Sequence, residues 1–379
     1  MMKKHMLRVV VLTATASLAL SACGGGNDSG TPAGEGGNSG AAAGKIGVIL
    51  PDTESSARWE GADRPFFQKA FEAAGVESDI QNAQNDATRF QTIADGMISA
   101  GVKALIITSL DPDSGGAVIK KATDAGIPVI DYDRANLGGG AKYYVSFDNV
   151  KVGTAIGEGL VGCLQAAGKK TGNVVELDGS PDDNNATLFK EGYDKVLKDS
   201  GYTIVAEQAV PKWNNDEGGR LFEQIYTKQD GKIDAVAAAN DGLGGAVVSV
   251  LKRNGLDGKV PVSGQDATDE GLQRILLGTQ CNTVYKAVSK EADAAAKLGI
   301  ALAKGDVAGA DALATDTFDD PNLPGEMRKT ITLKKVSCGT ELDIVQEGLP
   351  AVIPPEACCL GWQESLTLLA QLVEADIPD

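Results

Sequence analysis

Short apolar runs alternate with amphipathic stretches along the chain from residue 45 onward. The runs are rich in Val, Ile and Ala, as buried strands are, and the stretches between them have helical periodicity. Near-continuous apolar strands that alternate with helices indicate a parallel sheet covered on both faces. Two such series follow one another, so the pattern predicts an α/β fold of two doubly wound parallel-sheet lobes. The predicted strands are residues 46–50, 78–83, 104–108, 129–133 and 143–147, then 174–177, 203–209, 235–239, 260–262 and 283–285. The predicted helices include 64–74, 88–100, 117–125, 152–166, 188–198 and 245–254.

The first 23 residues have the pattern of an export signal. Lys3, Lys4 and Arg8 precede an apolar run, too short for a stop-transfer helix, that leads into Leu-Ser-Ala-Cys ending at Cys23. This resembles a bacterial lipoprotein signal, so we expect residues 1–22 to be removed and Cys23 to anchor the chain by lipid on the extracytoplasmic face of the membrane. Small and polar residues then predict a flexible linker over 23–44. An ordinary signal peptide with an incidental cysteine is the alternative.

Charge and histidine content exclude whole classes of function. The chain has a formal net charge of −17 at pH 7, and the predicted signal removes only positive charge, so nucleic acid is a poor partner. The single histidine, His5, lies within that signal. The mature chain therefore lacks the residue needed for Ser-His-Asp or Cys-His catalysis and for His-ligated zinc. We expect a protein that is not an enzyme and that holds no cofactor and no metal.

Five cysteines follow Cys23, an odd number for an oxidising compartment. Cys163 lies late on a predicted helix and Cys281 early on a predicted strand, so both could lie at the end of one lobe and pair there. Cys338 could pair with Cys358 or with Cys359 in the C-terminal tail. Buried free thiols are the alternative for all of them.

Polar residues follow nearly every predicted strand. Ligands of open parallel sheets bind at the carboxyl ends of the strands, so these residues are candidates for a site. Asp and Asn are also favoured as helix N-caps, which is the alternative for any single one. The set is Asp52, Asp133, Arg134, Asp148, Asn149, Asp178, Asp182, Asp183, Asn184, Asn185, Asn240, Asp241, Gln265, Asp266 and Lys286.

Carboxylates, amides and basic side chains in one cleft suit a neutral polyhydroxylated ligand. A sugar hydroxyl donates and accepts, and these groups offer both kinds of partner. Two of the three tryptophans, Trp59 and Trp213, fall in loops after predicted strands, beside Arg58 and Asn214. Their indoles could cover the faces of a sugar ring. Packing on their own lobe is the alternative, and Trp362 in the tail is expected in the core.

Seven segments, in order and each at a predicted strand end, resemble the periplasmic sugar-binding proteins of the ribose, galactose and xylose group, most closely its xylose-binding branch. The resemblance covers Lys45 to about Leu333 and does not extend to the tail, where a terminal helix is expected to end near Ala375. The loop before Trp213 also departs from the pattern. The segments are Arg58-Trp59, Asp131-Tyr-Asp-Arg134, Ser146-Phe-Asp-Asn149, Gly179-Ser-Pro-Asp-Asp-Asn-Asn-Ala186, Asn240-Asp241, Ser263-Gly-Gln-Asp-Ala267 and Thr283-Val-Tyr-Lys286.

The resemblance implies a type I periplasmic binding protein fold, with two lobes joined by a three-segment hinge. One lobe would hold 45–147 and about 286–325, and the other 148–285 and about 326–379 with the tail. The implied function is capture of a monosaccharide, D-xylose or a similar sugar, by hinge closure, and its delivery by a monomer to an ABC permease. The implied ligand contacts are Arg58, Trp59, Asp133, Arg134, Asp183, Asn185, Trp213, Asn240, Asp266 and Lys286.

Two other functions remain open. A lipoprotein of the same fold could report a different small polar ligand to a membrane sensor. More distantly, Gly242-Leu-Gly-Gly-Ala-Val247 follows a predicted strand and opens a helix, close to a dinucleotide fingerprint with Asp266 as its acidic residue, which would suggest a nucleotide-dependent enzyme.

Overall fold

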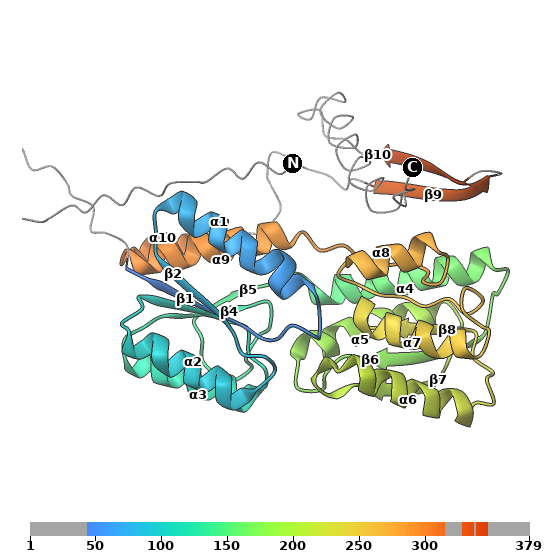
Figure 1. Ribbon diagram of the computed structural model, residues 1–379, viewed down its shortest axis with the longest axis horizontal. Coiled ribbons are helices and arrows are strands. Elements are labelled where there is room, and N and C mark those ends of the chain that lie inside the picture. Colours follow the sequence, from blue (N-terminus) through green and yellow to red (C-terminus); the bar gives the residue numbers. More distant parts are fainter. Residues whose placement is uncertain (1–43, 315–327, 337–338, 348–379) are drawn as a thin grey trace, which may run out of the picture. The chain divides into compact units, whose positions relative to one another are not determined.

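The computed structural model describes residues 44–314, 328–336 and 339–347 (Figure 1). The predictions for the signal, for Cys23 and the linker, and for Cys338, Cys358, Cys359, Trp362 and the terminal helix lie outside these residues.

The first lobe is built on a five-stranded parallel sheet in the order β2-β1-β3-β4-β5. Figure 1 shows α2 and α3 on one face of this sheet, and on the other face α1 beside α9 and α10, which come from far along the chain. Each face has its own apolar core, and Ala292, Ala295 and Leu298 of α9 belong to the core that contains Phe67 of α1. The elements are β1 (Ile46–Leu50), α1 (Arg64–Ala74), β2 (Ser78–Asn82), α2 (Ala87–Ser99), β3 (Ala104–Ile107), α3 (Pro112–Asp124), β4 (Val129–Tyr132), β5 (Tyr143–Val145), α9 (Val288–Ala303) and α10 (Val307–Leu313).

The second lobe is built on a three-stranded parallel sheet in the order β7-β6-β8. A single apolar core joins its strands to its helices other than α8, with Phe189, Tyr193 and Phe222 fully or almost fully buried. The elements are α4 (Asn149–Ala166), β6 (Asn173–Asp178), α5 (Asn184–Asp199), β7 (Thr203–Ala209), α6 (Asn215–Lys228), β8 (Ala235–Ala238), α7 (Asp241–Arg253) and α8 (Asp269–Leu276). A separate antiparallel pair is formed by β9 (Arg328–Val336) and β10 (Gly339–Glu347).

Eight of the ten predicted strands are confirmed: β1 and β7 have the predicted bounds, β6 is one residue longer at each end, and the other five end one or two residues early. Residues 260–262 and 283–285 are not strands: they form only the isolated bridges Val236↔Val262 and Gln265↔Val284. The strand predicted to reach Asp133 ends at Tyr132, because Asp133 has a φ of 62°, outside the extended region. The strand predicted to reach Phe147 ends at Val145.

Most predicted helices begin too late, because a polar cap precedes the apolar pattern. The helix predicted from 117 starts at Pro112, and those predicted from 152, 188 and 245 start at Asn149, Asn184 and Asp241. Each follows an Asp or Asn whose side chain accepts from a backbone N–H of the first turn. Only the helix at 64–74 has the predicted bounds.

In the structure Cys163 and Cys281, a pair that the sequence allows, form a disulfide between residues 118 positions apart. Cys163 lies near the end of α4, so the bond ties this helix to the segment that follows α8. Among the described residues, no helix has both the length and the apolar composition of a membrane span.

Candidate functional site

The ten predicted contact residues line one pocket, together with Ser55, Ser56, Phe189 and Gln265. The space between its atoms, with its mouth, is about 300 Å³. Its lining comes from both lobes: the loop after β1 and the end of β4 on one side, and the loops after β6, β7 and β8 on the other. The pocket thus brings together seven residues predicted from strand ends and the separately predicted Arg58, Trp59 and Trp213.

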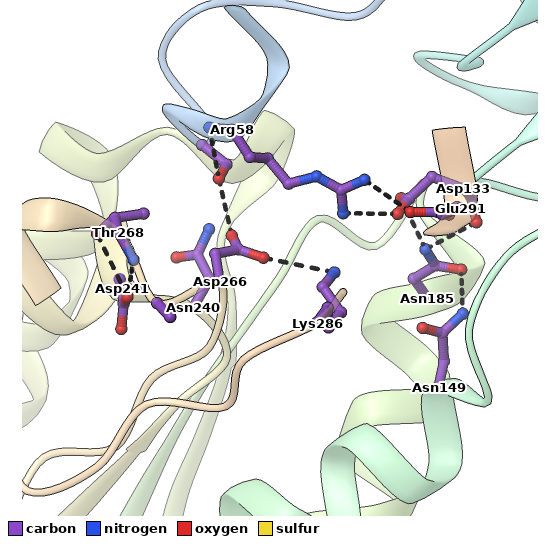
Figure 2. Close-up of polar contacts among 12 residues, drawn as sticks. Arg58, Asp133, Asn149, Asn185, Asn240, Asp241, Asp266, Thr268, Lys286 and Glu291 are labelled. Atoms are coloured by element: carbon purple, nitrogen blue, oxygen red, sulfur yellow. Dashed lines mark hydrogen bonds and ion pairs between the residues drawn. The ribbon is translucent and has the colours of Figure 1, made fainter. Parts of the chain in front are cut away.

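Arg58 is the centre of the charges on the first-lobe side. Its guanidinium forms ion pairs with Asp63 at 2.8 Å, Asp133 at 2.8 Å and Glu291 at 2.9 Å. Tyr132 Oη donates a hydrogen bond to Asp63 at 2.6 Å. All five side chains are buried, and Figure 2 shows Arg58 directed at Asp133 and Glu291.

The three carboxylates around Arg58 differ in their pKa directions. Burial raises the pKa of Glu291 well above its ordinary value, and Asp133 raises it further in spite of Arg58. Burial also raises the pKa of Asp63. Burial acts in the same direction on Asp133, but Arg58, then Lys286 and Arg134, outweigh it and hold the pKa of Asp133 below its ordinary value. Among these three carboxylates, Asp133 is therefore the one whose ionised form the surrounding cations favour most clearly.

The N–H groups of both pocket indoles donate hydrogen bonds to other residues of the protein. Trp59 Nε1 donates to Ser55 Oγ at 3.2 Å, and Trp213 Nε1 donates to Asp183 Oδ2 at 3.0 Å. Arg134 Nε contacts the same Asp183 oxygen at 2.8 Å. The indoles are thus fixed by their edges, and the guanidinium groups of Arg58 and Arg134 lie over the Trp59 ring, 4.4 and 5.5 Å from its centroid.

Asn240 and Asp266 line the second-lobe side. The Asn240 side chain accepts from Leu243 N, as the cap of α7, and donates to Ser55 O of the other lobe at 2.9 Å. Asp266 has a φ of 96°, accepts from Ser56 Oγ at 2.8 Å and lies 3.4 Å from Lys286 Nζ. Asp and Asn occupy such positive-φ positions more readily than most residues.

A chain of amides leads from α4 to the pocket. Asn149 donates to Asn185 Oδ1 at 2.9 Å, and Asn185 donates to Asp133 O at 3.0 Å and Asp133 Oδ1 at 3.1 Å (Figure 2). Asn149 is the first residue of α4, where the chain enters the second lobe. Predicted contact residues of one lobe therefore bond directly to those of the other.

Several strand-end residues have local roles instead. Asp52 accepts from Glu54 N, Ser55 N and Ser55 Oγ and shapes the loop after β1. Asp148 caps α4, and Asp178 accepts from Tyr193 Oη. The helix-cap alternative therefore applies to Asp148, whereas Asp52 and Asp178 accept hydrogen bonds within their own lobes.

Sequence reasoning missed Asp63 and Glu291. Both lie in helical segments, Asp63 in the π-helical turn Trp59–Asp63 and Glu291 in α9, so strand ends gave no sign of them. A Glu among the small apolar residues of 288–303 is the one signal that could have indicated a buried partner for a cation.

The glycines of the dinucleotide-like segment have a packing role. A Cβ on Gly244 would lie 2.9 Å from Ser263 O, and one on Gly245 would lie 2.8 Å from Arg274 Nη1. The buried Asp241 carboxylate accepts from Thr268 N and Thr283 Oγ1, at the N-terminus where a pyrophosphate would have to bind. An anion there is disfavoured by the carboxylate.

Within the part of the chain that the structure describes, one group of carboxylates is close enough to hold a cation: Glu176, Asp194 and Glu207 of the second lobe. The ammonium of Lys190 already contacts Glu176 at 2.9 Å and Glu207 at 3.0 Å. The group is therefore accounted for as a salt-bridge cluster.

The model of the periplasmic binding protein domain matches residues 46–306, which is more than half of the chain. The chain belongs to the periplasmic binding protein family. The type I fold predicted for it is thereby confirmed. The match ends within the segment that returns to the first lobe.

Several relatives of this binding protein have names that refer to sugars. It is 36% identical to the D-xylose-binding periplasmic protein of Escherichia coli (strain K12) over 296 residues, which covers 77% of this chain and 87% of the relative. It is 35% identical over 263 residues to the multiple sugar-binding periplasmic receptor ChvE of Rhizobium radiobacter, covering 64% and 73%. An ABC transporter solute-binding protein from Clostridium phytofermentans, solved with bound β-D-glucose, has 32% identity and a TM-score of 0.61, covering 68% of this chain and 84% of that one.

The C-terminal part of this periplasmic binding protein matches a different family model. A model described as activator of Hsp90 ATPase homolog 1-like protein matches residues 311–374. This agrees with the departure of the tail from the sugar-binder pattern, and most of that segment lies outside the described residues.

Proposed function

We propose that this protein captures a neutral monosaccharide, with D-xylose as the first candidate, in the pocket between its lobes and delivers it to an ABC permease. The observation that carries the proposal is the convergence of all ten predicted contact residues on one pocket. The names of the relatives support the sugar and the transporter, and they span xylose, glucose and several sugars at once.

The charges of the lining favour an uncharged ligand. Three cations and three carboxylates line the pocket, and each cation is already close to a carboxylate: Arg58 to Asp133, Arg134 to Asp183, and Lys286 to Asp266. An anionic ligand would have to displace one of these carboxylates. A sugar hydroxyl can bond to both members of a pair, because it donates to the carboxylate and accepts from the cation.

Ligand capture follows from the division of the pocket between the lobes. A sugar that bonds to Asp133 on one side and Asp266 on the other stabilises the closed form, because only that form offers both sets of contacts. Binding and hinge closure are then one equilibrium. The surface formed by the two closed lobes would be the one presented to the permease.

We further propose that Cys23 carries the lipid that holds the protein at the extracytoplasmic face of the membrane. The expected result is that the protein sediments with membranes and that Cys23→Ser releases it. Mass spectrometry of the N-terminal peptide tests the acyl group directly. An unmodified Cys23 in the mature protein would contradict this part of the proposal.

The function is tested by a thermal-shift screen of the mature protein against monosaccharides and polyols, followed by calorimetry. A bound sugar raises the melting temperature by mass action. Asp266→Ala is expected to weaken binding by roughly 2 to 3 kcal/mol, because it leaves ligand hydroxyls unpaired in a buried site. Asp86→Ala, which alters an exposed cap of α2, is the matched control. Absence of binding to every sugar would refute the proposal, and unchanged affinity in Asp266→Ala would remove that residue from the site.

A further inference from the structure

Gly179 lies directly behind one of the two pocket indoles. It is the residue after β6, it is buried, and it does not line the pocket, whereas Trp213 does. A Cβ built on Gly179 would lie 2.1 Å from Trp213 Cη2, 2.2 Å from Cζ2 and 2.6 Å from Cζ3. The outer ring of the indole therefore occupies the place that a side chain at position 179 would need.

The backbone gives no other reason for glycine at this position. Its φ lies outside the left-handed region that favours glycine, in contrast to Gly168 and Gly201 in the same lobe. An alanine could adopt the same backbone conformation without strain. The missing Cβ is therefore required by the indole and not by the chain.

Trp213 cannot easily move away from such a Cβ except toward the pocket. Its Nε1 is held by Asp183, its backbone N–H donates to Val210 O at 3.1 Å, and the preceding Lys212 N donates to Ser180 Oγ at 3.0 Å. Lys212 and Trp213 both have φ of 56°, in the left-handed region that residues other than glycine seldom occupy. Val210 N in turn bonds to the carbonyl oxygens of Asp178 and Gly179, which locks the two loops together.

We propose that Gly179 is a positioning residue that sets the width of the ligand pocket, and so the size of sugar admitted, by allowing the Trp213 indole to lie back against the end of β6. The effect on sugar size rests on the proposed function, whereas the position of the indole rests on the geometry alone. A larger residue at position 179 would push the indole into the pocket. Ligand size would then decide how much affinity is lost.

The test compares wild type with Gly179→Ala on two sugars that differ by one hydroxymethyl group, D-xylose and D-glucose. The variant is expected to lose about 10- to 200-fold more affinity for the larger sugar than for the smaller one, the usual range for one misfitting group in a pocket. Calorimetry gives both affinities. An equal loss for both sugars, or no loss, would overturn the proposal.

A second readout does not depend on any sugar. With ¹⁹F-labelled tryptophan, the Trp213 resonance, assigned by its absence in Trp213→Phe, is expected to shift in ligand-free Gly179→Ala. In the Trp213→Phe background, whose smaller ring does not reach Gly179, the same substitution is expected to cost little stability, so that the double-mutant cycle shows coupling. An unshifted Trp213 resonance, together with additive effects of Gly179→Ala and Trp213→Phe on stability, would overturn the proposal.

Gly159→Ala is the matched control, because its Cβ would also be crowded, at 2.2 Å from the Asn282 side chain, but away from the pocket. It is expected to lower stability without changing the ratio of the two affinities. If the wild-type protein binds no sugar, the proposed function is wrong. The ¹⁹F resonance of Trp213 and the double-mutant cycle on stability then still decide the role of Gly179.

Discussion

Arg58 shows at the residue scale how a buried charge is retained beside the pocket. One guanidinium compensates Asp63, Asp133 and Glu291, and none of the four side chains is more than slightly exposed. Removing one partner of such a group is far more costly than removing an exposed ion, because the remaining charges stay buried without compensation. Coulombic attraction to these carboxylates raises the pKa of Arg58 against the effect of its burial. Intact pairing of the group therefore matters for the stability of the first lobe as well as for the pocket.

Arg58→Met is expected to lower the free energy of unfolding by about 3 to 5 kcal/mol at pH 8. The loss should be smaller at pH 5, because the carboxylates left without Arg58 become protonated there. Urea unfolding followed by circular dichroism measures both values, and adding Glu291→Gln should recover part of the loss.

Lys120→Met removes an exposed ion pair with Asp124 and should cost no more than about 0.5 kcal/mol. A similarly small cost for Arg58→Met would show that the carboxylates do not depend on Arg58.

Asp131 allows a second prediction at this scale, concerning pH. Burial raises the pKa of Asp131 to about 6, while a hydrogen bond from Asn136 N lowers it in part. In the unfolded chain the pKa is about 3.9, so above pH 6 the folded state holds an ionised carboxylate that it disfavours, and below pH 4 the penalty is gone. Asp131→Asn should therefore stabilise the protein relative to wild type by on the order of 2 kcal/mol more at pH 7.5 than at pH 4.

The measurement is the difference in free energy of unfolding between variant and wild type at the two pH values. Glu77→Gln, at an exposed position, should show no such difference. The same difference at both pH values would mean that Asp131 titrates alike in the folded and unfolded chain.

At the scale of elements, the sequence predicted which helices exist better than where they begin. The apolar residues of 152–166 mark the buried face of α4, but the helix starts at Asn149, after the Asp148 cap. Capping residues are polar and so do not contribute to the apolar pattern, and Asp and Asn fit both a cap and a binding site. Strand predictions were wrong only at 260–262 and 283–285, where the pairing is reduced to single bridges. The extent of pairing depends on the partner strand and not on local composition.

Asn240 caps α7 and also lines the pocket, and its contribution to stability can be separated from its contribution to sugar binding. Asn240→Ala should lose the cap of α7, at a cost of about 0.5 to 2 kcal/mol in stability, and should also weaken sugar binding through the lost contact with Ser55 O. Asp86→Ala should lose only the cap of α2. Chemical denaturation and calorimetry of the two variants separate the effects, and equal sugar affinity in both would contradict a role for Asn240 in the pocket.

At the scale of the whole molecule, the pocket is predictable where strand ends converge and not where other elements reach it. Asp133, Asn185 and Asn240 follow strands of two different sheets, Asp266 follows the isolated bridge at Gln265, and the parallel arrangement brings them together. Glu291 reaches Arg58 from a helix more than two hundred positions away, a contact that only the return of α9 to the first sheet creates. Local pattern contains no information on such a pairing.

Contacts between the lobes also occur outside the pocket lining. Asn85 Nδ2 donates to Lys212 O at 3.2 Å, and Asn215 Nδ2 donates to Glu54 O at 3.0 Å. Neither Asn lines the pocket, so their bonds support closure without selecting a ligand. Closure and selection can therefore be changed separately, the second through Gly179.

Asn85→Gly combined with Asn215→Ala should favour the open form and weaken all sugars by the same factor. Glycine suits position 85 because Asn85 has a φ of 57°, so that only the side-chain bond is lost. Two hydrogen bonds contribute roughly 1 to 3 kcal/mol together, which predicts a uniform loss of about 5- to 150-fold in affinity. Small-angle scattering should show a larger radius of gyration without sugar and the wild-type value at saturating sugar. A loss that depends on sugar size would place these residues with Gly179 in selecting the ligand, and an unchanged radius without sugar would mean that the two bonds do not hold the lobes together.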